Sequence, residues 1–225
     1  ALGVTKGSRI AILADPSLRL SSVVMAILSL GAIVVPIPLS MRALLHKEDS
    51  VFINELINKN CSYVILSEDQ EALKLERLLD EAFEPVQVYS LDGTSEEVLP
   101  LFPAEVEAGF YERIVFLNDA DSAALVLWED DQVLTHKMLI ESQFLCKDRT
   151  FSHGDCVWIS SDVMRHLGLE LFLGALVGKH TVCLSTDKDD YSHLKPSIVL
   201  MGNSEIQDLY RRVLAQQSDI SKILY

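Results

Sequence analysis

A short acidic turn is the part of the chain where chemistry would be expected and where the residue types argue against it. Within Asp121–Ile140, DSAALVLWEDDQVLTHKMLI, an apolar run is separated from the start of a helical pattern by Glu129, Asp130, Asp131 and Gln132. A strand-to-helix turn binds phosphate when it offers backbone amides, hydroxyls and a lysine. At close range, the repulsion energy between a carboxylate and a phosphate is on the order of kilocalories per mole rather than tenths of a kilocalorie per mole. We therefore expect no nucleotide here, and a short solvated turn is also unlike an oxygen cage for a cation.

The other reactive side chains are scattered and predict no catalytic residue, metal or cofactor. The histidines form no pair four residues apart, and the four cysteines form no C-x-x-C pair, so we expect reduced, mostly buried thiols in a cytoplasmic protein. A serine, aspartate and histidine set at Ser160 or Ser161, Asp162 and His166 lacks the glycines of a nucleophile elbow beside either serine, which argues against a hydrolase.

Composition indicates a folded, acidic chain. The 225 residues are 49% hydrophobic, enough to bury one large core or two small ones, and the net charge of −14 argues against a nucleic-acid partner. The uncharged run 23–39 contains Gly31 and then Pro36 and Pro38, which favours a buried helix followed by a strand over a membrane span. The chain begins at Ala1 with no basic leader, which suggests a segment of something longer.

Strand and helix patterns alternate along the chain. Strands are predicted over 8–13, 32–37, 62–66, 86–90, 125–128, 156–160, 180–184 and 196–201. Helices are predicted over 18–30, 50–59 and 68–83, from the Thr135 cap onward, over 166–177, and after 203. This order predicts a three-layer α/β fold with a largely parallel sheet covered by helices on both faces. Residues 91–120 hold prolines, glycines and acids, and we expect a connector between subregions 1–90 and 121–225 of one domain, 1–225.

Four segments, in order, resemble one enzyme superfamily. The opening LGVTKGSRIAILADPSLRLSSVVMAILSLGAIVVPIPLSM matches a "G-x-x-x-G-D-x-V-A-I" strand and a "K-x-G-A-x-x-V-P-x" segment. NELINKNCSYVILSED, HLGLELFLGALVGKHTVCL and PSIVLMGNSEIQDLYRRVL resemble its following helix and strand, its "H-x-x-G-L" segment and a later helix. The chain thus resembles the adenylate-forming (AMP-binding) superfamily: acyl-CoA synthetases, fatty acyl-AMP ligases and nonribosomal peptide adenylation domains.

The resemblance implies the fold of the N-terminal part of an adenylation domain and suggests an acyl pocket. His166 stands in the family's histidine position, and Gly168 would line the pocket with it, with Trp158 or Met164 nearby. A histidine at a helix start is more commonly half-buried and bonded to backbone than in contact with a ligand, so that interpretation of His166 stays open.

The departures from the family pattern predict a non-catalytic domain. Active relatives carry a "Y-T-S-G-T-T-G-x-P-K-G" loop around the ATP phosphates, and EDDQ replaces it here, although Thr135-His136 resembles the "L-T-H" that follows. The chain stops at Tyr225, before the family's adenine, magnesium and ribose sites and its catalytic lysine.

Two functions remain open on this basis. One is a structural or protein-interaction module that contacts neighbouring domains of a multidomain polyketide, nonribosomal peptide or lipid-metabolism assembly. The other is a domain that binds an acyl or aryl acid and has lost adenylation. We expect no cofactor and no membrane association in either case.

Overall fold

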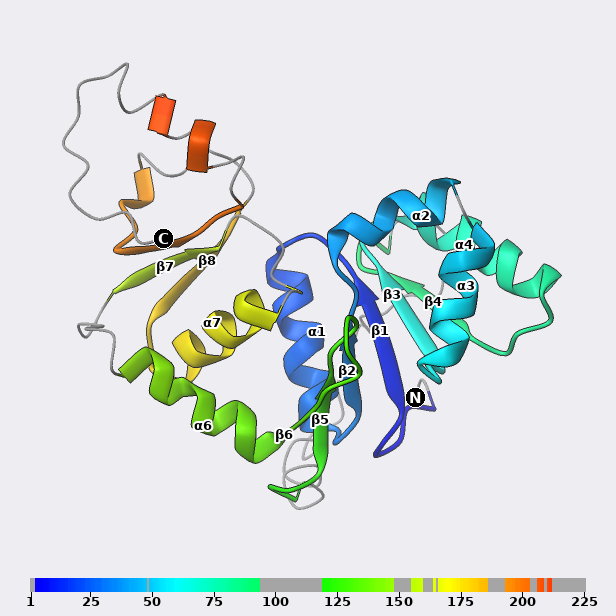
Figure 1. Cartoon of the computed structure of the whole chain (residues 1–225), viewed down its shortest axis with the longest axis horizontal. Coiled ribbons are helices and arrows are strands. Elements are labelled where there is room, and N and C mark those ends of the chain that lie inside the picture. The colour runs from blue at the N-terminus through cyan, green and yellow to red at the C-terminus, as the bar shows by residue number, and fades with distance from the viewer. Residues whose placement is uncertain are drawn as a thin grey trace. The chain divides into compact units, whose positions relative to one another are not determined.

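The computed structural model describes residues 3–47, 49–93, 119–147, 155–159, 164, 166–185, 193–202, 206–208 and 210–211 (Figure 1). The chain divides into two compact units. Unit 1 comprises Ala1–Asp15 and Arg19–Met138, and unit 2 comprises Pro16–Leu18 and Leu139–Tyr225. Each unit is described by itself below.

Unit 1 contains a six-stranded sheet in the order β4-β3-β1-β2-β5-β6. The strands are β1 (Arg9–Leu13), β2 (Ile33–Pro36), β3 (Tyr63–Leu66), β4 (Gln87–Ser90), β5 (Ala123–Val126) and β6 (Val133–Thr135). Neighbouring strands from β4 to β5 pair in parallel, with Ile10 opposite both Val34 and Tyr63, and β6 is antiparallel to β5. Strands β2 and β3 are buried at every position, as expected for a parallel sheet covered on both faces.

The uncharged run after β1 forms a helix, a turn and a strand. Helix α1 (Leu18–Ser29) is followed by a turn at Gly31, whose φ of 69° is a left-handed conformation that costs glycine little, and β2 begins at Ile33. None of the helices in the described ranges has the length and apolar character needed to cross a bilayer. The prediction of a buried helix and strand over this run is confirmed.

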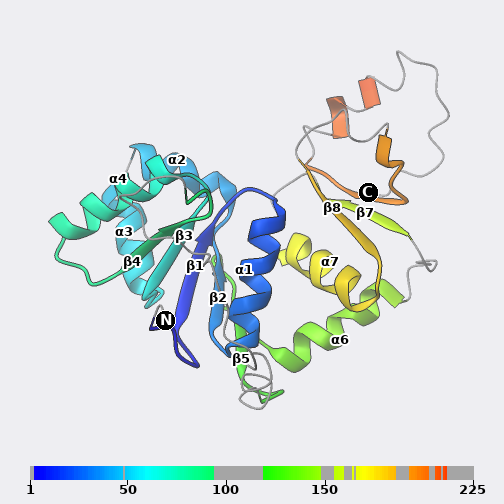
Figure 2. The same cartoon turned by 180° about the vertical axis from the view of Figure 1, so that it is seen from behind.

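Helices on the opposite face of the sheet from α1 enclose a hydrophobic core of unit 1 (Figure 2). Between β2 and β3 the chain forms η1 (Leu39–Met41), α2 (Arg42–Lys47) and α3 (Asp49–Asn58), and α4 (Asp69–Glu81) joins β3 to β4. Their buried side chains form one cluster with the sheet; its fully buried members include Leu45, Phe52, Leu56 and Leu75.

Unit 2 contains a three-stranded parallel sheet in the order β8-β7-β9. The strands are β7 (Cys156–Ile159), β8 (Thr181–Leu184) and β9 (Ile198–Leu200), and α7 (His166–Val177) contacts β7 and β8. Helix α6 (His136–Lys147) begins in unit 1 and continues into unit 2. Trp158, on the central strand β7, is fully buried.

The predicted α/β class and most elements are confirmed, and the strands are distributed over two sheets. Strand β5 pairs with β2, so it belongs to the same sheet as the N-terminal strands. The sequence reading missed α2 and β6, which are too short to show a clear periodicity. Most of the predicted connector 91–120 and most of the last helix lie outside the described residues.

Replacing Phe52 by Ala tests the core of unit 1. Phe52 is fully buried and stacks on Trp128 with ring centroids 6.4 Å apart, so we expect Phe52→Ala to lower the free energy of unfolding by about 3–5 kcal/mol. Urea unfolding followed by tryptophan fluorescence measures this loss. The neighbouring Val51 is exposed, and Val51→Ala should change stability by no more than about 0.5 kcal/mol. Similar losses in the two variants would contradict the assigned helix face.

Candidate functional site

The acidic turn connects two antiparallel strands instead of joining a strand directly to a helix. We predicted a strand over 125–128 followed by α6, whereas β5 ends at Val126 and β6 intervenes before the helix. Leu127 N donates to Gln132 O (2.9 Å) and Asp131 N to Leu127 O (3.2 Å), so the residues between the strands form a closed hairpin. Asp131 has a φ of 59°, a left-handed conformation that aspartate tolerates better than most residues.

A buried lysine holds this hairpin. Lys59, at the end of α3, donates from Nζ to Trp128 O (2.7 Å) and to Asp131 Oδ1 (2.6 Å), and Nζ lies 5.6 Å from the centre of the Trp128 ring. The Lys59 side chain is 7% exposed and that of Asp131 is 69% exposed. The hairpin therefore meets a cation supplied by the chain itself, and two of its backbone amides are already bonded within the hairpin, which leaves fewer of them for a phosphate.

The start of α6 agrees with the sequence interpretation of Thr135 and His136. Thr135 Oγ1 accepts a hydrogen bond from Met138 N (3.2 Å), the contact expected of a helix N-cap. His136 N donates to Ser122 O (3.1 Å), and its imidazole is partly buried. Burial, and to a lesser extent the charge of Lys6, lowers the pKa of His136. Thr135 and His136 thus shape the beginning of the helix.

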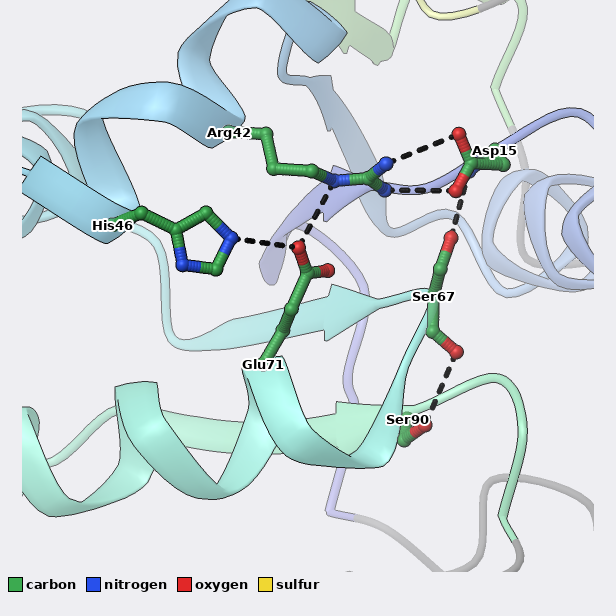
Figure 3. Close-up of polar contacts among 6 residues, drawn as sticks. All are labelled: Asp15, Arg42, His46, Ser67, Glu71 and Ser90. Atoms are coloured by element: carbon green, nitrogen blue, oxygen red, sulfur yellow. Dashed lines mark hydrogen bonds and ion pairs between the residues drawn. The ribbon is translucent and has the colours of Figure 1, made fainter.

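A second group of polar residues, which the sequence did not reveal, lies where three parallel strands end. We call Asp15, Arg42, His46, Ser67, Glu71 and Ser90 the switch-point network (Figure 3). Strand β1 lies between β2 and β3, and the chain continues from β1 to one neighbour and reaches the other only after crossing back. In open α/β sheets, ligands bind outside the carboxyl ends of the strands at such a reversal.

Arg42 is the centre of the switch-point network. Its Nη1 and Nη2 donate to the two carboxylate oxygens of Asp15 at 3.2 and 2.9 Å. Its Nε lies 3.0 Å from Glu71 Oε1, in an ion pair that lacks hydrogen-bond geometry. His46 Nε2 lies 3.4 Å from the same Glu71 oxygen (Figure 3). One guanidinium therefore joins the end of β1 to α4.

Serine side chains connect the strand ends beneath Arg42. Ser67 Oγ accepts a hydrogen bond from Asp15 N (2.7 Å), and Ser67 O accepts one from Ser90 Oγ (3.3 Å) (Figure 3). These bonds tie the residues that follow β1 and β3 to the last residue of β4. The backbone at this edge of the sheet is consequently fixed by the network.

Glu71 is the most buried charged group of the network. Its side chain is 6% exposed, and within the described part of the chain the buried Oε2 has no hydrogen-bond partner. Burial raises the pKa of Glu71, the nearby Glu68 raises it further, and Arg42 and His46 oppose the rise. The pKa of Arg42 is raised although burial lowers it, because the hydrogen bond to Asp15 and the charges of Glu71 and Asp15 favour the guanidinium.

The residues predicted to line an acyl pocket lie in unit 2. Trp158 and Met164 are buried, and Trp158 Nε1 donates to Ser185 O (2.9 Å). Gly168 is buried within α7, and the side chain of His166, at the first position of that helix, lies outside the described residues. The role of these residues in a pocket stays a prediction.

The described cysteines form no disulfide with one another. These are Cys61, Cys156 and Cys183, and burial raises the pKa of Cys61 to about 12, which makes this thiol a poor nucleophile. Within the described ranges, no three histidine, cysteine, aspartate or glutamate residues come together as a metal site.

Comparison with known proteins places the fold. No family model matches the chain, and no curated protein matches it by sequence. Solved structures do match. Coronafacic acid ligase from Pectobacterium brasiliense superposes with a TM-score of 0.66 at 15% identity over 97% of this chain. VinN gives 0.71 at 14% identity over 96%, and O-succinylbenzoate coenzyme A synthetase from Bacillus subtilis gives 0.62 at 16% identity over 87%.

The chain has the fold of part of these ligases. It spans 44% of the coronafacic acid ligase chain, 53% of VinN and 50% of the synthetase. The adenylate-forming fold predicted from the sequence motifs is therefore confirmed for the portion that this chain contains, while the activities of the complete ligases are not thereby shown for it.

Neutralising either partner of the Lys59–Asp131 pair tests how the hairpin is held. We expect Lys59→Met to lower the free energy of unfolding by about 1–3 kcal/mol, because it leaves the buried Trp128 carbonyl without its donor. Asp131→Asn should cost less than about 1 kcal/mol, because the carboxylate is exposed and screened by water and salt. Urea unfolding of both variants at low and high salt measures the two effects. A larger loss for Asp131→Asn would mean that the ion pair, and not the carbonyl contact, anchors the hairpin.

Glu71 makes a signed prediction about pH. Because its pKa is raised in the folded state, the folded chain binds more protons than the unfolded chain between the two pKa values. The stability that Glu71 contributes is present below the unfolded pKa and is lost as the pH rises through the folded pKa. The difference in unfolding free energy between Glu71→Gln and wild type should therefore shift in favour of the variant from about pH 4 to 7. A shift in the opposite direction would mean that Arg42 and His46 outweigh burial.

Proposed function

We propose that this chain is a non-catalytic domain with the adenylate-forming fold that serves as a structural or protein-interaction module within a multidomain biosynthetic or lipid-metabolism assembly. The observation that carries the proposal is the β5–β6 hairpin, in which the Lys59 amine and the Asp131 carboxylate bind each other. The fold is that of ligases, and the chemistry at this turn differs from what a triphosphate requires.

Charge and hydrogen bonding at the hairpin support a loss of nucleotide binding. A triphosphate needs free amides, hydroxyls and a cation. Here Leu127 N and Asp131 N are bonded within the hairpin, and Gln132 N is bonded to Asp130 Oδ1 (3.1 Å). Lys59 is buried and its amine is already bonded to Trp128 O and Asp131. An incoming phosphate would meet the exposed side chains of Glu129, Asp130 and Asp131.

The scaffold itself supports a role that depends on folding and surface. Unit 1 retains a fully buried core on its parallel sheet, so the fold is maintained although the acidic turn offers no phosphate site. The net charge of −14 disfavours acidic partners by like-charge repulsion, which favours neighbouring domains with neutral or basic contact surfaces.

ATP binding tests the proposal directly. We expect magnesium ATP to leave the melting temperature of the chain unchanged, because the acidic hairpin repels phosphate. The measurement is sensitive, since a ligand at one hundred times its Kd adds about 2.7 kcal/mol of stability. A matched variant with Glu129→Gln, Asp130→Asn and Asp131→Asn should also fail to bind, since it removes the acids without supplying a phosphate loop. A saturable shift in the wild-type chain would overturn the proposal.

The acyl- or aryl-acid binder remains the alternative, and the same measurement separates it from a structural module. Fatty, aryl and amino acids tested without ATP should produce no saturable shift if the domain acts through its surface. A saturable shift that Trp158→Leu or Met164→Ala removes, in a variant that still unfolds cooperatively, would favour the alternative.

A further inference from the structure

A side chain of the chain itself, that of Arg42, lies at the topological reversal of the unit 1 sheet. Asp15 follows β1 and Ser67 follows β3, and these two strands are the neighbours between which the connections diverge. Arg42 reaches this position from α2, on a different connection, and lies between the carboxylates of Asp15 and Glu71 (Figure 3). The usual ligand position of an open α/β sheet thus holds a guanidinium.

We propose that Asp15 and Glu71 form a guanidinium-binding site whose resident ligand is Arg42, and that the site accepts a small alkylguanidinium when the Arg42 side chain is removed. The proposal concerns a different part of unit 1 from the hairpin, and it does not depend on whether the chain binds ATP.

The arrangement of acceptors fits a guanidinium. Asp15 offers both carboxylate oxygens to the two terminal nitrogens, at 3.2 and 2.9 Å, which is the forked geometry that distinguishes arginine from lysine. Glu71 Oε1 approaches the third nitrogen, Nε, from the other side at 3.0 Å. An ammonium is a point charge and could not satisfy both carboxylates with the same fixed spacing.

The unsatisfied oxygen of Glu71 is a second, independent indication of a binding site. The Glu71 side chain is 6% exposed, and Oε2 has no hydrogen-bond partner among the described residues. An acceptor left without a donor at a buried position costs free energy, so a donor directed to Oε2 would be stabilising there. Ethylguanidinium carries the same five N–H groups as the Arg42 head, and because it is not attached to α2 it can reorient toward Oε2.

The charges around the Arg42 guanidinium also favour a cation. Asp15 and Glu71 face the guanidinium directly, and Glu68, before the first residue of α4, adds to the same negative potential. His46 faces Glu71 from α2, and Lys74 of α4 is directed to a backbone carbonyl, with Nζ 2.6 Å from Leu45 O. Without Arg42, the carboxylates of Asp15 and Glu71 would face each other with no cation between them and would repel each other.

The segment that carries Arg42 is a short helix outside the sheet. Helix α2 is six residues long and is held by Leu45, which is buried in the core, and by Leu44, which packs against the core, so its attachment does not rest on Arg42 alone. The side chain of Arg42 is 25% exposed, so the guanidinium can be approached from solvent. A guanidinium that is not part of the helix can therefore take the place of Arg42 without rebuilding the sheet.

Chemical rescue of Arg42→Ala tests the site. The variant should melt at a lower temperature than wild type, and ethylguanidinium at millimolar concentration should raise its melting temperature saturably. Ethylammonium at equal ionic strength should have a clearly smaller effect, and wild type, whose site is full, should show no saturable rise. Adding Glu71→Gln to Arg42→Ala should weaken the rescue several-fold in apparent affinity.

Arg19→Ala is the matched control. Arg19 Nη1 donates to the backbone carbonyls of Leu91 (2.6 Å) and Asp92 (2.7 Å), so its removal empties an arginine position with different acceptors. Equal rescue of Arg19→Ala and Arg42→Ala, or equal effects of ethylguanidinium and ethylammonium on Arg42→Ala, would overturn the proposal. So would the absence of any saturable response.

The test does not depend on Arg42→Ala folding unaided. If the variant is insoluble, its refolding yield with ethylguanidinium is compared with that with ethylammonium, and a higher yield with ethylguanidinium alone is expected. Arg42→Lys gives a further readout: it keeps the charge and loses the fork, so it should melt below wild type and respond to ethylguanidinium. Failure of both variants to respond would exclude a guanidinium site.

Discussion

Two cationic side chains from the connection between β2 and β3 bind three carboxylates of unit 1. Arg42, at the start of α2, is held by Asp15 and Glu71, and Lys59, after α3, is held by Asp131 and the Trp128 carbonyl. In a chain with a net charge of −14, carboxylates that meet at a strand end or in a tight hairpin repel one another unless a cation lies between them. The Arg42 and Lys59 contacts therefore offset the repulsion among these carboxylates at the positions that the sheet topology gives them.

The two pairs differ in how they contribute to stability. The Lys59 amine is buried and its carbonyl contact with Trp128 is buried too, so removing the donor leaves an unsatisfied acceptor. The Asp131 carboxylate is exposed and adds little beyond the local turn. In the switch-point network, burial of Glu71 works against its ion pair with Arg42, so the network specifies geometry at the strand ends more than it adds free energy.

Both arrangements bear on how this fold can be used. At the switch point, Arg42 fills with a side chain of the chain itself a position where α/β folds commonly bind ligands, and in the β5–β6 hairpin Lys59 pairs with Asp131. A solved ligase that shares the fold, O-succinylbenzoate coenzyme A synthetase, is 16% identical to this chain. A shared scaffold can carry different chemistry, because function resides in loops and the fold resides in the core.

The sequence by itself determined the α/β class, the order of most strands and helices and the cap at Thr135, because these depend on periodicity and on neighbouring residue types. It placed the acids of the turn correctly but assigned them to a strand-to-helix junction, because a three-residue strand such as β6 has no periodic signal. Only the tertiary structure paired Lys59 with Asp131, 72 residues away, and brought Arg42 to Asp15 and Glu71. Such contacts depend on which strands become neighbours. The local sequence around each residue carries no signal of which distant residue a parallel sheet will bring next to it.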